Sequence, residues 1–248
     1  MPEYQYVSYE LLDEGRIARV LLDRPEVRNA QNRGMLVELD DALLRAEADD
    51  EVRVVILGGA GPMFTSGHDI GSKVAMEEYG PGLMLMWACD LIVGSEEVRF
   101  ADVVGTRLGM CGVEYFAHPW ELGPRKTKEL MLTGDAIDIH EAHRLGMVAK
   151  VFPRDELVER TLELARRIAQ LPTMTALLIK ESVNQTVDNM GFHNALHACF
   201  TLHQLNHSHW AGVRDDGYPV GDEAHGVPSW RDAPAVVLAV KDQVRADA

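Results

Sequence analysis

The sequence contains no hydrophobic run near the roughly 20 residues that a membrane-spanning helix requires. Its N-terminus also has no basic segment followed by an apolar one, so we expect no signal peptide and no membrane partner. Cysteine is scarce: Cys89, Cys111 and Cys199 are widely separated, odd in number and form no CxxC pair. This usage favours a reduced, cytoplasmic setting.

Basic residues are outnumbered, because 24 lysines and arginines stand against 39 aspartates and glutamates, for a net charge of −15. Binding to a phosphate backbone needs a basic surface, so this balance disfavours nucleic acid as a partner. A small anionic ligand is still compatible with it, since a few basic side chains and backbone amides can hold a phosphate locally. The 248 residues suffice for one large domain, alone or with a helical extension.

Two common enzyme motifs are missing from the sequence, as are internal repeats and low-complexity linkers. No G-x-S-x-G elbow occurs, which disfavours an α/β hydrolase. The glycines at 58, 59 and 61 follow an apolar run but lead into Pro62, without the G-x-G-x-x-G opening of a dinucleotide-binding helix.

The N-terminal part of the sequence alternates strand and helix patterns. Residues 5–12 and 17–22 predict two strands of a hairpin around Gly15. Apolar residues recur at helical spacing over 33–48. The short β-branched run at 52–57 predicts a strand that is buried on both faces.

The C-terminal part is mainly helical in pattern. Residues 83–88 predict a buried helix and 90–93 another strand. Further helices are expected at 124–132, 139–145, 157–171, 176–187 and 191–206. The fold class is therefore α/β, with a C-terminal helical extension.

Four stretches carry motifs in a fixed order: LDRPEVRNA at 22–30, VVILGG with FTSGHDI at 54–70, GLMLMWACDLIV at 82–93, and LTG, AHRLGMV and VFP within 132–153. Together they resemble the crotonase (enoyl-CoA hydratase/isomerase) superfamily, over about residues 5 to 190. The resemblance implies a crotonase-like ββα spiral core at 1–140 and a helical extension at 141–248. In that family the extension packs subunits together, so we expect a homotrimer or a dimer of trimers.

The resemblance also implies the chemistry. The family stabilises a thioester enolate with two backbone N–H groups and binds no permanent cofactor, while a coenzyme A thioester is the substrate. The first donor corresponds to the backbone of His68. The second falls near Pro81, which has no N–H, so we assign Gly82, which directly precedes the apolar helix. The acyl-CoA groove is expected to include Arg24, Arg28, Gly67, His68, Asp69, Ile70 and Gly71.

The spacing between the two donors departs from the family. Only about a dozen residues separate His68 from Gly82, where the family has a few dozen that include a central strand. A true deletion would expose the edges of a buried sheet. We therefore interpret the printed sequence as omitting a segment between Ile70 and Leu83, which an overlong Cα–Cα step would reveal.

Both glutamates that hydratases of this family use are replaced. Met84 occupies the first position, and after Phe100-Ala101-Asp102 the sequence has neither proline nor acid. Asp102 lies near but is displaced and short, so Glu114 is the preferred alternative. Glu114 could instead be a charge that complements a helix N-terminus, and the protein could also be a non-hydrating enzyme or an acyl-CoA-binding member without the acids.

Histidines crowd the last predicted helix, with His193 and His197 spaced four residues apart. No glutamate follows His193 as in H-E-x-x-H, and no cysteine or aspartate completes a ligand set. We therefore expect no metal site, and we assign these histidines to packing or subunit contact.

Overall fold

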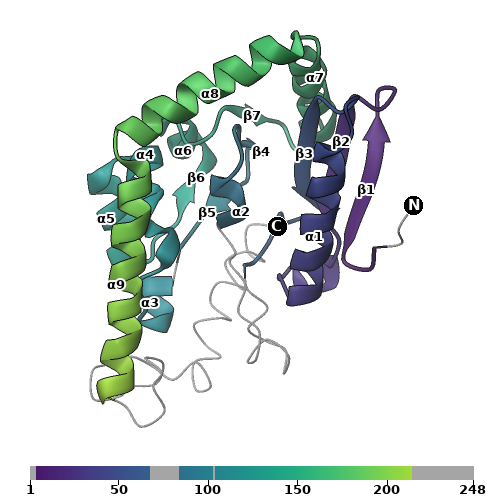
Figure 1. The fold of residues 1–248 in the computed structure, drawn as a ribbon. Helices are drawn as coiled ribbons and strands as arrows, with labels where there is room; N and C mark the ends of the chain where they lie inside the picture. The colour runs from purple at the N-terminus through teal and green to yellow at the C-terminus, as the bar shows by residue number, and fades with distance from the viewer. Residues whose placement is uncertain (1–3, 68–83, 103, 214–248) are drawn as a thin grey trace. The chain divides into compact units, whose positions relative to one another are not determined.

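The computed structural model describes residues 4–67, 84–102 and 104–213 (Figure 1). Contacts between Cα atoms divide the chain into two compact units, each made of two separate stretches. The first unit comprises Met1–Leu91 and Phe152–Thr186, and the second comprises Ile92–Val151 and Val187–Ala248. The division predicted at residue 140 stays a prediction.

The first unit is built on a three-stranded sheet of order β1-β2-β3. β1 (Val7–Leu12) pairs antiparallel with β2 (Ile17–Leu22), which confirms the predicted hairpin. β3 (Val54–Gly59) pairs parallel with β2 and thus requires a crossover connection. Helix α1 (Arg33–Glu47) is that crossover, as the helical spacing predicted.

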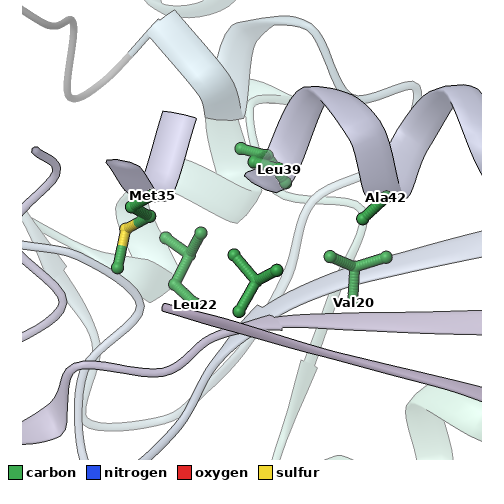
Figure 2. Packing of buried hydrophobic residues seen from close by; sticks show 6 residues of the cluster. Val20, Leu22, Met35, Leu39 and Ala42 are labelled. Carbon is green, nitrogen blue, oxygen red and sulfur yellow. The ribbon is translucent and has the colours of Figure 1, made fainter. Parts of the chain in front are cut away.

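The core of this unit forms where α1 packs on the hairpin. Asn32 caps the helix by accepting a hydrogen bond from the Met35 backbone N–H at 2.8 Å. The buried face of α1 then meets the inward side chains of the strands, as Figure 2 shows. The cluster consists of Val7, Val20, Leu22, Met35, Leu39 and Ala42.

One expectation about β3 is wrong. The strand was predicted to be buried on both faces, yet Val55 is 41% exposed and its neighbours are half-buried. Within the described residues, β3 pairs with β2 alone, so it forms an edge of the sheet. An edge strand is less covered than an interior one, which accounts for the exposure.

The rest of the first unit comprises η1 (Pro25–Val27), α2 (Met84–Trp87), α7 (Leu157–Ala169) and most of α8 (Thr173–Asn189). Helix α7 packs on β2 and β3. Its Arg166 Nε lies 2.6 Å from Asp13 Oδ2 in the hairpin turn. This ion pair holds the pKa of Asp13 below its ordinary value, chiefly through the side-chain hydrogen bond.

The second unit contains two small sheets, β4–β7 and β5–β6. Their strands are β4 (Val93–Ser95), β5 (Arg99–Phe100), β6 (Ile137–Asp138) and β7 (Lys150–Phe152). Its helices are α3 (Val104–Leu108), η2 (Val113–Phe116), α4 (His118–Leu122), α5 (Pro124–Thr133), α6 (Ile139–Leu145) and α9 (Phe192–Val213). No helix in the described part of the chain is both long and apolar enough to cross a membrane.

Several predicted boundaries need correction, including the helix expected at 176–187, which runs from Thr173 to Asn189. The strand expected at 90–93 begins at Val93, because Asp90 lies in a bend and its carboxylate is 2.8 Å from Lys180 Nζ. The last helix runs to Val213 rather than ending at 206. The helices at 124–132 and 139–145 are confirmed to within a residue.

Candidate active site

Asn29 is the buried polar centre of the first unit, with no exposed surface. Its backbone is left-handed, with φ of 53°, a conformation that asparagine tolerates better than most residues. Its Nδ2 donates to the carbonyl oxygens of Ala60 and Met63 at 2.9 and 2.8 Å. Its Oδ1 accepts from the Arg24 backbone N–H at 2.8 Å. One side chain therefore joins the LDRPEVRNA segment to the loop that follows β3.

Backbone hydrogen bonds extend this connection to the last described residue of the loop. The Ser66 N–H donates to the Arg28 carbonyl at 2.9 Å, and the Gln31 N–H donates to the Gly67 carbonyl at 2.8 Å. Gly67 has φ of 91°, which strongly favours glycine. The structure thus brings together Arg28 and Gly67, two of the predicted substrate-binding residues.

The two predicted arginines differ in their surroundings. The Arg24 guanidinium donates from Nη1 to the Ala30 carbonyl at 2.8 Å and lies 5.6 Å from the Tyr6 ring centre. Arg28 is exposed at the left-handed end of η1. Arg24 therefore supports the segment, whereas Arg28 is the more accessible cation.

Several predicted site residues lie outside the described part of the chain. They are His68, Asp69, Ile70, Gly71 and Gly82. The Cα–Cα test for an omitted segment between Ile70 and Leu83 falls on the same residues. Their assignments stay predictions.

A second polar cluster lies in the second unit and contains Asp102, Glu114, Tyr115 and His118. Asp102 and His118 are almost completely buried, with 2% and 3% of their side chains exposed. Asp102 Oδ2 lies 3.4 Å from His118 Nε2. Buried charged and polar side chains are costly unless they are paired, so this cluster calls for a chemical explanation.

Tyr115 closes the cluster on the other side of Asp102. Its hydroxyl accepts from the Gly105 N–H at 2.8 Å and donates to Asp102 Oδ1 at 3.4 Å. Its ring packs edge-on against His118, with centres 5.6 Å apart. Burial first, and the Asp102 charge second, raise the pKa of Tyr115, so the phenol is neutral.

Glu114 is the predicted catalytic carboxylate, and the structure places it half-buried in η2. Its carboxylate lies over Gly112, where an added Cβ would approach it to 2.8 Å. Burial, followed by the Asp102 charge, raises the pKa of Glu114 despite a hydrogen bond to its own backbone. A helix N-terminus would lower that pKa, so its dipole does not dominate here.

Helix α9 packs on η2 and holds the segment that leads into it. Four of its side chains bind backbone groups of residues 109–112: Cys199 Sγ to Gly112 O at 3.4 Å, His203 Nδ1 to Cys111 O at 2.6 Å, Asn206 Oδ1 to Cys111 N at 2.5 Å, and Trp210 Nε1 to Gly109 O at 3.1 Å. The spacing of four, three and four residues keeps these side chains on one helix face. They fix the turn that presents Glu114.

The described residues contain no group of three or more His, Cys, Asp or Glu side chains arranged to hold a metal. His193 Nε2 instead lies 3.5 Å from Asp188 Oδ2, at the start of α9. His203 and His207 contact each other through their Nε2 atoms at 3.1 Å.

The model of the enoyl-CoA hydratase/isomerase family matches residues 13–80 and 77–211, which is most of the chain. The chain belongs to this family. Membership confirms the resemblance seen in the sequence motifs.

Named relatives of this family agree with that assignment. A Mycobacterium tuberculosis (strain ATCC 25618 / H37Rv) protein, provisionally named enoyl-CoA hydratase EchA13, is 52% identical, with 97% of this chain and 93% of the relative covered. The mitochondrial enoyl-CoA hydratase of Pongo abelii is 30% identical, with 73% of each chain covered.

Solved structures confirm the crotonase-like α/β fold. The structure of a "probable enoyl-CoA hydratase" from Mycobacterium smegmatis has a TM-score of 0.78 at 40% identity, covering 86% of this chain and 98% of the other. That of a "probable enoyl-CoA hydratase" from Mycobacterium thermoresistibile has a TM-score of 0.76 at 38% identity, covering 84% of this chain and 99% of the other.

The family match is interrupted between the two predicted donors. It consists of two separate stretches that overlap at residues 77–80, between His68 and Gly82. The alignment with the M. tuberculosis relative extends over 295 residues, more than the 248 of this chain. That relative therefore contains residues without a counterpart here, which supports the interpretation of an omitted segment.

Some functional candidates were not singled out by sequence reasoning. Asn29 was part of a recognised motif but had no assigned role, and Tyr115 and His118 had none. The i, i+4 spacing of Glu114 and His118 was a visible signal for His118. The sequence favours Glu114 over Asp102, yet the two lie in the same cluster.

Proposed function

We propose that this family member processes acyl-CoA thioesters by stabilising a thioester enolate, with Glu114 as the group that transfers the proton. The observation that carries the proposal is the raised pKa of the half-buried Glu114, in a chain that lacks the family's usual glutamates. A carboxyl whose pKa is raised by burial holds its proton to higher pH, which favours a role as a general acid.

The oxyanion would be held by the backbone N–H groups of His68 and Gly82. Support for the first donor is that the loop leading to it is fixed by Asn29 and by the Gln31–Gly67 hydrogen bond. A donor that is fixed before the reaction stabilises developing charge without reorganising. Because the donor is the backbone, His68→Ala should leave turnover nearly unchanged.

The coenzyme A thioester is the substrate, and we propose no permanently bound cofactor. Gly67, His68, Asp69, Ile70 and Gly71 would line the acyl-CoA groove. Arg28 would bind a phosphate of coenzyme A, since its exposed guanidinium lies on the segment that holds this loop. Arg24 would contribute by stabilising that segment. We also propose a cytoplasmic location.

The test is turnover of crotonyl-CoA by the purified protein and by Glu114→Gln. Removal of the proton-transfer group should lower kcat about 10²–10⁴-fold. Glu121→Gln is the matched control, because Glu121 is also a carboxylate in this unit whose pKa burial raises. Equal turnover by Glu114→Gln and the unaltered protein would remove Glu114 from the mechanism.

The second candidate function is binding of acyl-CoA without turnover. It is favoured by Met84 and by the non-acidic residues after Asp102, where hydratases carry their glutamates. Calorimetric binding of crotonyl-CoA with no hydration or isomerisation, over several chain lengths, would establish this alternative.

A further inference from the structure

We infer that Asp102 and His118 form a buried carboxylate–imidazole pair that positions Glu114 and controls its protonation. The inference rests on the proposed function, because it gives these two residues a role through Glu114. Neither residue is placed in contact with a substrate, so both are positioning residues.

The geometry of this pair follows from what each imidazole nitrogen faces. His118 Nδ1 lies 3.1 Å from the Glu114 backbone carbonyl, which can only accept, so Nδ1 carries a hydrogen. His118 Nε2 then faces Asp102 Oδ2 at 3.4 Å. This contact is attractive only with a proton between the two atoms, on the imidazole or on the carboxyl.

Asp102 is held so that Oδ2 is directed at His118. Its Oδ1 accepts from the Val104 N–H at 3.1 Å and from the Tyr115 hydroxyl at 3.4 Å. Its Oδ2 is fully buried and has no hydrogen bond of good geometry to any described residue, which leaves the His118 contact as its compensation. Because both side chains are buried, bulk water does not compete with His118 for Asp102 Oδ2.

The pair reaches Glu114 in two ways. His118 binds the backbone carbonyl of Glu114 and so fixes the last turn of η2. The Asp102 charge raises the pKa of Glu114, whereas the His118 charge lowers it to a smaller extent. The other titratable groups that act on Glu114, or on which it acts, are His203, Tyr115, Cys111 and Cys199.

Two substitutions distinguish the effect of the charges at positions 102 and 118 from the effect of the hydrogen bonds that these side chains make. Asp102→Asn can accept the same hydrogen bonds at Oδ1 and donate from Nδ2 to a neutral His118, so geometry is kept and the charge is removed. His118→Asn can still donate to the Glu114 carbonyl from Nδ2, but it removes the imidazole that faces the Asp102 carboxylate. The first should lower the pKa of Glu114 and the second should raise it further.

The pKa of Glu114 can be measured without an activity assay. Thermal unfolding of the unaltered protein and of each variant is compared, over a range of pH, with that of the same protein carrying Glu114→Gln. A buried carboxyl with a raised pKa loses its stabilising effect as pH rises from the unfolded-state pKa to the folded-state pKa. The difference in unfolding free energy between the glutamate protein and its glutamine counterpart, here called the stability gap, therefore stops changing once the pH rises above the folded-state pKa. We expect this point to move to lower pH in Asp102→Asn and to higher pH in His118→Asn.

The limb of the pH–kcat profile should move in the same two directions as the stability gap. Shifts of one sign in both variants, or no shift, would overturn the pair. A moving stability gap with a fixed activity limb would support the pair and overturn the catalytic role of Glu114. If His118→Asn fails to fold, the shift measured in Asp102→Asn decides whether the pair exists. The double variant Asp102→Asn/His118→Asn, which buries no charge at position 102, then tests the role of His118.

Discussion

The Nδ2 atom of Asn29 lies 2.8 Å from the carbonyl oxygen of Met63, and this bond joins two segments that are 34 residues apart. The same amide also reaches Ala60. Because partly buried carbonyls need donors, Asn29 stabilises this path of the loop after β3.

Replacement of Asn29 by alanine should destabilise the protein by about 3 kcal/mol, since it leaves three partly buried backbone groups without this partner. Urea unfolding measures this loss, and the KM for an acyl-CoA should rise with it. Asn32→Ala is the control, because it removes only the cap of α1 and should cost about 1 kcal/mol. Equal costs for the two variants would contradict the proposed role of Asn29.

The second prediction concerns the packing of α1 on the hairpin (Figure 2). Leu39 is 3% exposed, so Leu39→Ala should lower the free energy of unfolding by about 3 kcal/mol through lost burial and a residual cavity. Leu44 is on the same helix and 55% exposed, so Leu44→Ala should change it by less than about 0.5 kcal/mol. Denaturant midpoints compare the two.

The third prediction is a stability gain from a change that removes activity. Because the folded-state pKa of Glu114 is raised, its stabilising effect is complete below the unfolded-state value and is lost as pH rises through the folded-state pKa. Glu114→Gln should therefore raise Tm at pH 7 and have little effect at pH 4. Thermal scans at both pH values are the measurement, and a lower Tm at pH 7 would show that the carboxylate stabilises the fold.

The fourth prediction concerns assembly as a homotrimer or a dimer of trimers. α8 has no buried residue, and its apolar side chains at Met174, Leu177, Leu178, Ile179 and Val183 are each more than half exposed. A surface of this kind is typical of a subunit interface. Leu178→Glu should reduce the mass measured by light scattering toward the 27.6 kDa of one chain. Asn184→Glu, exposed on the same helix, should not.

The fifth prediction follows from the interrupted family match at residues 77–80. β3 pairs with β2 alone in the described part of the chain, so a further strand would have an edge to join. The intact mass of the protein from its natural source should therefore exceed 27.6 kDa. Insertion of the corresponding segment of the M. tuberculosis relative between Ile70 and Leu83 should raise stability. A natural mass of 27.6 kDa would show that the short form is the real one.

Local patterns in the sequence predicted much of the fold. The hairpin at 7–22 and helix α1 were predictable because alternation and helical spacing report which face is buried. The exposure of β3 was not, because burial depends on which strands are its neighbours, and no local pattern records that. The extension of α9 to Val213 was missed because its contacts, such as Trp210 with Gly109, are about a hundred residues away in sequence.

The candidate site divides in the same way. Glu114 could be proposed because the family motifs predict where acids are expected, and this sequence has Met84 and non-acidic residues after Asp102 there. The contact between Asp102 and His118 could not, because it joins two residues with ordinary local surroundings through a buried network. Asn29 was visible as a motif position, but its partners Ala60 and Met63 are backbone groups without a sequence signature.

The four α9 side chains that bind residues 109–112 make helix register a functional property. One inserted residue after Cys199 would turn the three later side chains by about 100° and withdraw all of them from the turn at 109–112 together. Single-residue insertions and deletions in α9 should therefore inactivate the enzyme more often than substitutions do, although no residue of this helix is assigned to touch substrate.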